Sequence, residues 1–80
     1  MDADVNTDRT DPIAHTLRAI RRQQNLSLRD VEVKSDGRFK AVVVGAWERG
    51  NRKPTVTRAQ ELLEFYGYTL RVVPLPEAIL

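Results

Sequence analysis

Residues 27–50 read SLRDVEVKSDGRFKAVVVGAWERG, and they contain two short apolar patterns separated by one turn signal. Ser27 is followed three positions later by Asp30, a spacing that approximates the capping box at the start of a helix. The dipeptide Asp36-Gly37 is typical of a turn. We therefore expect a helix from Ser27 to about Ser35, followed by a turn.

A second helix is expected from Lys40 to Arg49. Val44 and Trp47 lie at i, i+3 and would form its buried face, and Gly50 ends it. Glycine in a helix interior costs about 1 kcal/mol relative to alanine, and the three consecutive valines of this segment would suit a strand nearly as well. From the sequence alone, the strand alternative therefore stays open here.

One further helix is expected on each side of this stretch. Asp11-Pro12 is typical of a helix start, and apolar residues at i, i+4 and i+7 predict a helix that continues to about Gln24. On the other side, Pro54-Thr55 opens a helix that Gly67 closes, because apolar residues again repeat at helical spacing. The sequence therefore predicts helices before and after the central pair.

The period of the pattern changes after Gly67. From Tyr68 to Val73 the side chains alternate with a period of two, which predicts one β-strand that Pro74 ends. A single strand in a helical chain has no partner for its backbone hydrogen bonds. We therefore expect this strand to pair with the same strand of a second chain.

Length and composition indicate one small globular domain. The chain has 80 residues, of which 41% are hydrophobic and 30% are charged. Its apolar stretches are far shorter than the ~20 residues of a membrane span, and its acidic start is unlike a signal peptide, so we expect a cytoplasmic protein. With no cysteine and one histidine, it has no nucleophile–base pair and no clustered metal ligands, so we expect no enzyme, no metal and no cofactor.

Charge is distributed unevenly along the chain. Residues 1–11 are acidic and are expected to form a flexible tail. From Arg18 to Arg58, eleven basic residues stand against four acidic ones, an excess of +7. Such a local excess is typical of a protein that binds a polyanion. Judged by charge alone, an ordinary solvated surface explains the excess about equally well.

The motifs together resemble the Cro/C1 (XRE) family of helix-turn-helix DNA-binding proteins. The resemblance covers residues 13 to 67 and rests on Leu17-Arg18-Ala19-Ile20-Arg21, on Leu26-Ser27 and on the segment WERGNRKP from Trp47 to Pro54. Within the family, residues 27–45 are most similar to the BldD-like subgroup. The terminal strand resembles that of HipB-like antitoxins, in which it pairs with its copy in a dimer.

This resemblance implies a fold and a division of the chain. The fold would be an all-α, λ-repressor-like helix-turn-helix domain of four to five helices plus a C-terminal β-strand. Residues 12–67 would bind DNA, and residues 68–80 would form the strand and tail used for dimerisation. The dimer contacts would come from Tyr68, Leu70 and Val72.

The resemblance also implies roles for single residues. Ala41, Val42 and Ala46 would face base edges, where apolar side chains suit thymine methyl groups. Arg38 and Lys40 would lie near the DNA backbone before the reading helix, and Arg21 and Glu48 would join that helix to the first helix by an ion pair. Phosphate contacts would come from Arg29, Arg49, Asn51, Arg52 and Lys53.

The expected function is that of a sequence-specific transcriptional regulator, with repression favoured, which binds double-stranded DNA at an inverted-repeat operator as a homodimer. The alternative is an antitoxin that binds a protein toxin and regulates its own operon, which the terminal strand favours. A phage regulator would differ only in its biological setting.

Overall fold

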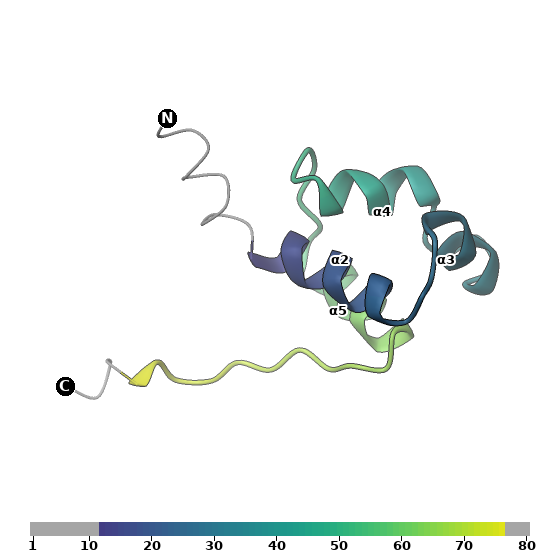
Figure 1. The fold of residues 1–80 in the computed structure, drawn as a ribbon. Coiled ribbons are helices and arrows are strands. Elements are labelled where there is room, and N and C mark those ends of the chain that lie inside the picture. The colour runs from purple at the N-terminus through teal and green to yellow at the C-terminus, as the bar shows by residue number, and fades with distance from the viewer. Residues whose placement is uncertain (1–11, 77–80) are drawn as a thin grey trace.

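The structure, a computed structural model, describes residues 12–76. This range contains four helices, α2 (Pro12–Gln23), α3 (Leu28–Lys34), α4 (Ala41–Glu48) and α5 (Val56–Phe65). α4 lies along one side of the bundle, α2 and α5 lie beneath it, and α3 closes one end (Figure 1). The four expected helices are confirmed, and their arrangement fits the expected λ-repressor-like fold.

The ends of the helices follow the local sequence signals. Ser27 Oγ accepts the N–H of Asp30 at 2.9 Å, and Asp30 Oδ2 accepts the N–H of Ser27 at 2.8 Å. This completes the capping box of α3. Hydrogen bonding of the Asp30 carboxylate to Ser27, chiefly to its backbone N–H, lowers the pKa of Asp30. Thr55 caps α5 in a similar way, because its Oγ1 accepts the N–H of Arg58 at 3.1 Å.

Two turns depend on residues with positive φ. Asn25, between α2 and α3, has φ of 59°, and Asp36 and Gly37, between α3 and α4, have φ of 57° and 79°. Most L-residues avoid this left-handed region, whereas glycine, asparagine and aspartate adopt it most readily. The turn expected at Asp36-Gly37 is confirmed.

The buried face of α4 forms the centre of the core and decides between helix and strand for this segment. Val44 and Trp47 are 0% and 5% exposed, as their i, i+3 spacing predicted. A strand would bury alternate residues instead and would need a neighbouring strand. The other members of the main buried cluster are Leu17, Ile20, Val31, Phe39, Leu62, Leu63 and Tyr66.

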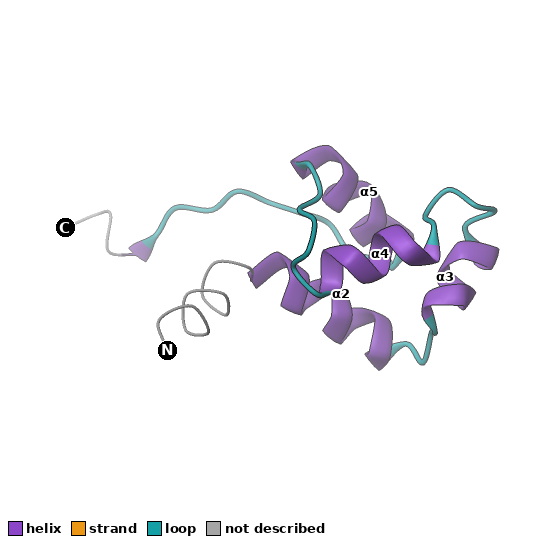
Figure 2. Cartoon of the chain, turned by 90° about the horizontal axis from the view of Figure 1, so that it is seen from above, coloured by secondary structure: helices purple, strands orange, loops and turns teal. Residues whose placement is uncertain are grey.

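The strand expected from Tyr68 to Val73 does not form within the described residues, none of which lies in a strand (Figure 2). α5 ends where the N–H of Tyr68 donates to the carbonyl of Leu63 at 2.8 Å. Leu70 then packs against the core, and the chain extends away from the helices with Val72 fully exposed. The physical reason is that a strand requires a ladder partner, which residues 12–76 of a single chain do not supply.

The acidic tail expected over residues 1–11 lies outside the described residues, as do residues 77–80. None of the helices between residues 12 and 76 is long and apolar enough to cross a membrane.

Candidate nucleic-acid interface

An ion pair fixes the C-terminal end of α4 to α2. Arg21 donates from Nε and Nη2 to the two carboxylate oxygens of Glu48, at 2.7 and 2.9 Å, and from Nη1 to the carbonyl of Leu26 at 2.6 Å. The side chains of Arg21 and Glu48 are only 12% and 4% exposed. Hydrogen bonding to Glu48 raises the pKa of Arg21. The expected ion pair between these residues is confirmed.

A second carboxylate holds the N-terminal end of α4. Glu32, on α3, accepts the N–H of Ala41 at Oε1 with a distance of 2.8 Å. Its Oε2 lies 4.0 Å from Lys40 Nζ. The sequence does not predict this contact, because its only signal there is a Glu in the middle of a short helix.

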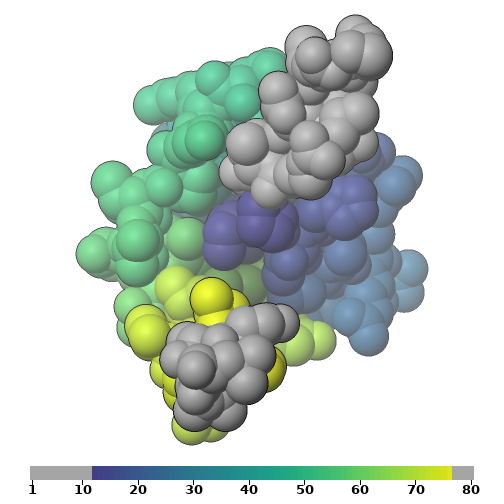
Figure 3. All heavy atoms as spheres, turned by 90° about the vertical axis from the view of Figure 1, so that its left-hand side faces the viewer, coloured from purple at the N-terminus to yellow at the C-terminus, as the bar shows by residue number. Residues whose placement is uncertain are grey.

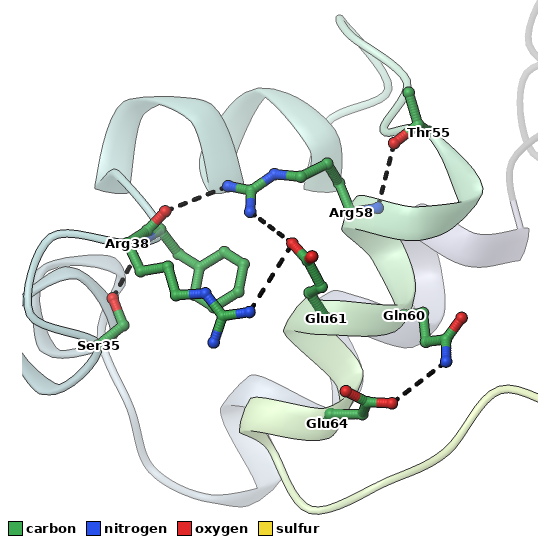
Figure 4. Close-up of polar contacts among 8 residues, drawn as sticks. Ser35, Arg38, Thr55, Arg58, Gln60, Glu61 and Glu64 are labelled. Atoms are coloured by element: carbon green, nitrogen blue, oxygen red, sulfur yellow. Dashed lines mark hydrogen bonds and ion pairs between the residues drawn. The ribbon is translucent and has the colours of Figure 1, made fainter.

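Arg58, on α5, holds the loop before α4 (Figure 4). Its guanidinium donates to the carbonyl of Arg38 at 3.1 Å and to Glu61 at 2.7 Å. The same group lies over the rings of Phe39 and Trp47, with distances of 4.9 and 5.8 Å to the ring centres. Arg58 therefore attaches the loop that leads into α4 to α5, a role that no local pattern in the sequence predicts.

Glu61 also pairs with Arg38, although more weakly, because their closest atoms are 3.8 Å apart. The Arg38 side chain is 57% exposed. A surface ion pair of this kind contributes at most about 1 kcal/mol, so Arg38 can leave Glu61 at little cost when a stronger anion such as a phosphate is present.

The first turn of α4 carries the exposed surface that the sequence predicted. Val42 is 79% exposed, Ala41 is half-buried, and the Lys40 side chain is 63% exposed. Together these residues form a small apolar surface next to a cation. Apolar side chains of this size suit thymine methyl groups in a major groove.

Ala46 does not belong to this exposed surface, so its expected position facing the groove is wrong. The residue is only 7% exposed. After Gly50 the chain folds back, and the N–H groups of Asn51 and Arg52 donate to the carbonyl of Ala46 at 3.0 and 3.3 Å. Residues 50–52 therefore lie against the helix at Ala46, a position that helical periodicity had predicted to be exposed.

Basic side chains flank α4 at its other end. Arg49 lies back across the helix, with its Nη1 only 3.0 Å from the position that a Cβ would occupy on Gly45. This glycine therefore leaves room for the Arg49 guanidinium, on a side of α4 where the same Cβ would lie 3.1 Å from Leu28 Cδ1. The remaining residues expected to contact phosphate are exposed as well, namely Arg29 at the start of α3 and Asn51, Arg52 and Lys53 after α4.

α4 is thus a short helix with an exposed first turn and with cations before and after it. An α-helix is about 10–12 Å across with its side chains, and the major groove of B-DNA is about 12 Å wide, so a helix of this kind is narrow enough to fit it. Exposed basic residues stand on both sides of α4 in the sequence, Arg38 and Lys40 before the helix and Arg49, Arg52 and Lys53 after it.

Comparison with known proteins agrees with this geometry. Residues 17–73 match the model of a helix-turn-helix family. A search of curated proteins found no match.

Among solved structures, the chain is similar to the crystal structure of the DNA-binding domain of BldD, with 59% identity and a TM-score of 0.70 over 72% of this chain and 82% of that one. It is equally similar to the S. venezulae BldD DNA-binding domain, with 59% identity and a TM-score of 0.69 over 72% of this chain and 84% of that one. This chain therefore belongs to the XRE-type helix-turn-helix family.

Proposed function

We propose that this protein is a sequence-specific transcriptional regulator, most simply a repressor, that reads an inverted-repeat operator with α4 as a homodimer. The observation that carries the proposal is the exposed first turn of α4 between two groups of basic residues. The similarity to the DNA-binding domain of BldD supports it. Such a protein acts where the genome lies, so we place it in the cytoplasm; the proposal requires no catalytic group and no cofactor.

Base contacts are assigned to few side chains. Ala41 and Val42 supply apolar contacts, and Lys40 and Arg49 supply donors that can reach guanine or a phosphate. With so few hydrogen-bonding groups on the helix, we expect DNA shape to contribute to discrimination as well.

Binding selections from a random duplex library test this assignment. The selected duplexes should contain an inverted repeat, with half-sites about 34 Å apart, because a two-fold dimer presents two copies of α4 about one DNA turn apart. Fluorescence anisotropy then measures affinity for the selected duplex. Val42→Glu places a carboxylate in the groove and should abolish specific binding, because it repels phosphate and meets no donor on thymine.

The matched control is Gln60→Glu, which adds the same charge at an exposed position of α5, beneath α4 (Figure 1). It should leave affinity within about threefold of the wild type, since screening reduces the effect of a charge beyond ~8 Å at physiological salt. Normal operator binding by Val42→Glu would remove α4 as the reading element.

Phosphate contacts are tested separately by the salt dependence of binding. Arg52 is exposed directly after the reading helix. Arg52→Ala should weaken binding to all duplexes about equally and lower the slope of log K against log salt by ~1. An unchanged slope after substitution of Arg29, Arg49, Arg52 and Lys53 in turn would refute the phosphate assignment.

The dimer is proposed to form through the terminal segment. Val72, Val73 and Leu75 are 100%, 66% and 68% exposed, an unusual run of apolar side chains in contact with water. Nearby, an apolar groove is lined in part by Ile13, Val56 and Leu70. In Figure 3 the start of α2, the loop before α5 and the terminal segment meet on this one face. A second copy would supply both an antiparallel strand and an apolar cover.

Proline substitutions test this dimer. Successive N–H groups of a strand point to opposite sides, so either Arg71→Pro or Val72→Pro must remove a ladder hydrogen bond. Both residues are exposed, which spares the core, whereas Leu70 packs against it. Analytical ultracentrifugation should show one of the two variants as a monomer. If both remain dimers of unaltered affinity, another surface forms the dimer.

An antitoxin remains the second candidate, and the same exposed apolar segment favours it. In that case the chain also binds a protein toxin. Because antitoxins of the kind that this segment resembles are dimers as well, sedimentation of the isolated chain does not separate the two functions. Co-purification with the product of the neighbouring gene distinguishes the two functions.

A further inference from the structure

We propose that Glu32 is a positioning residue for base reading, which sets the placement of the first turn of α4 and so determines how well the protein distinguishes its operator from other DNA. The inference rests on the proposed function, because it assigns Ala41 and Val42 to the bases. It concerns a residue on α3 that has no place among the DNA contacts.

The start of α4 lacks a side-chain cap from its own N-cap residue. Its N-cap residue is Lys40, whose side chain makes no capping hydrogen bond. The first N–H groups of a helix have no partner within the helix and carry a partial positive charge. Glu32 supplies the missing acceptor from another helix, because its Oε1 lies 2.8 Å from the nitrogen of Ala41.

The same carboxylate restrains the cation next to the reading surface. Lys40 Nζ lies 4.0 Å from Glu32 Oε2, and the two side chains are 63% and 39% exposed. At this exposure the ion pair itself contributes little. The ion pair instead determines where the Lys40 side chain lies, because it keeps this side chain near α3. Ala41 and Val42 continue into the exposed first turn of α4.

α4 is therefore fixed at both ends by carboxylates that join it to different helices. Glu48, at its last residue, pairs with Arg21 of α2 at 2.7 Å. Glu32, from α3, holds its first residue. A base contact depends on placement to a fraction of an ångström, so loss of the first tether should disturb Ala41 and Val42 while the second tether keeps the helix folded.

Glu32 also acts through its charge, and the two effects can be separated. A carboxylate beside the reading helix repels phosphate whatever the base sequence, so its removal should raise affinity for every duplex. The hydrogen bond to Ala41 should matter only where bases are read. Glu32→Gln removes the charge and keeps an acceptor oxygen, whereas Glu32→Ala removes both.

The matched control is Asp36→Asn. Asp36 is an exposed residue four positions later, and its φ of 57° is one that asparagine also adopts. Asp36→Asn removes the same charge, from the turn that follows α3, and leaves the hydrogen bond between Glu32 and Ala41 in place.

The experiment measures, by fluorescence anisotropy, affinity for the selected operator and for a scrambled duplex of equal length. All three variants should bind the scrambled duplex more tightly than the wild type. Only Glu32→Ala should lower the ratio of operator affinity to scrambled affinity, by about fivefold or more, the discrimination carried by one good base contact. Glu32→Gln and Asp36→Asn should keep that ratio within about twofold.

Hydrogen exchange of the Ala41 amide in the free protein gives a reading that does not depend on DNA. Exchange should be faster in Glu32→Ala and near the wild-type rate in Glu32→Gln. A Glu32→Ala variant with the wild-type affinity ratio, or a Glu32→Gln variant that loses it equally, overturns the proposal. If the wild-type chain binds both duplexes alike, the proposed function is refuted. The Ala41 exchange rates would still show whether Glu32 holds the first residue of α4.

Discussion

Replacing Glu48 with alanine is expected to destabilise the protein by about 3 kcal/mol. The substitution removes two charge-assisted hydrogen bonds, of 2.7 and 2.9 Å, from Arg21, and it leaves that guanidinium facing a partly dry interior. Its third bond, from Nη1 to the carbonyl of Leu26 at 2.6 Å, remains and keeps the cation in place. The variant therefore retains a buried charge without its counter-charge.

The magnitude follows from burial and geometry. Removing one partner of a buried ion pair typically costs about 3–5 kcal/mol. We take the lower end because the Arg21 side chain is still 12% exposed and water can partly solvate it. For a domain of this size, 1 kcal/mol corresponds to about 4–8 °C in Tm, so the expected decrease is about 12–24 °C.

The assay is urea unfolding followed by circular dichroism, with Glu64→Ala as the matched control. Glu64 is exposed on α5 and contacts Gln60 at 3.2 Å. Its replacement should change the free energy of unfolding by no more than about 0.5 kcal/mol. The double variant Arg21→Met/Glu48→Leu should recover much of the loss, because apolar side chains of similar volume replace a buried pair at little cost.

A loss below about 1 kcal/mol for Glu48→Ala would refute this reasoning, because that is the effect of a surface ion pair. It would mean that the Arg21–Glu48 pair does not fix α4 to α2. If the double variant is as unstable as Glu48→Ala, an unpaired buried charge is not the cause of the loss.

Three further predictions concern single residues and are measured by chemical or thermal unfolding. Ser27→Ala should cost about 1 kcal/mol, because it removes the capping acceptor of α3. Gly37→Ala should cost about 1–2 kcal/mol, since the residue has φ of 79° and a Cβ there would meet only Lys40 Nζ at 3.5 Å. The buried hydroxyl of Tyr66 has no hydrogen-bond partner, so Tyr66→Phe should not destabilise the protein. Burial raises the pKa of Tyr66 from 10.0 to about 12, so folding favours its neutral form. The free energy of unfolding of the wild type should therefore fall as the pH rises through this interval, and Tyr66→Phe should lack this contribution.

Local features of the fold were predictable from the sequence because local chemistry determines them. The capping box at Ser27 and the left-handed turn at Asp36-Gly37 each depend on residues at most three positions apart. The segment of α4 was ambiguous for the same reason: its composition suits helix and strand, and only the burial of Val44 and Trp47 against other helices decides between them.

Of the contacts that position α4, the Arg21–Glu48 pair was predicted, through the family resemblance. The others join residues far apart in the sequence, and no local pattern marks them. Arg58 reaches the carbonyl of a residue 20 positions earlier, and Glu32 reaches an amide nine positions later. Phe39 is 1% exposed yet stands alone in a turn, where no periodicity marks it as core. Ala46 was misplaced because helical periodicity does not show where a following loop folds back.

The strand expected in the terminal segment failed to form for a different reason. Its alternating pattern from Tyr68 to Val73 predicts a strand, but the hydrogen-bond partner of a strand must exist before the strand can form. The pattern therefore points to a second chain, whose presence only a measurement of association can establish.

The most direct test of the central claim, that α4 and its basic flanks are the DNA-reading surface, is an NMR titration of the ¹⁵N-labelled protein with the selected operator duplex. We expect the largest amide shifts on residues 40–42 and 49–53, with smaller shifts at Arg29 and little change in the middle of α5. Large shifts confined to α5 and residues 68–76, with α4 unchanged, would contradict it.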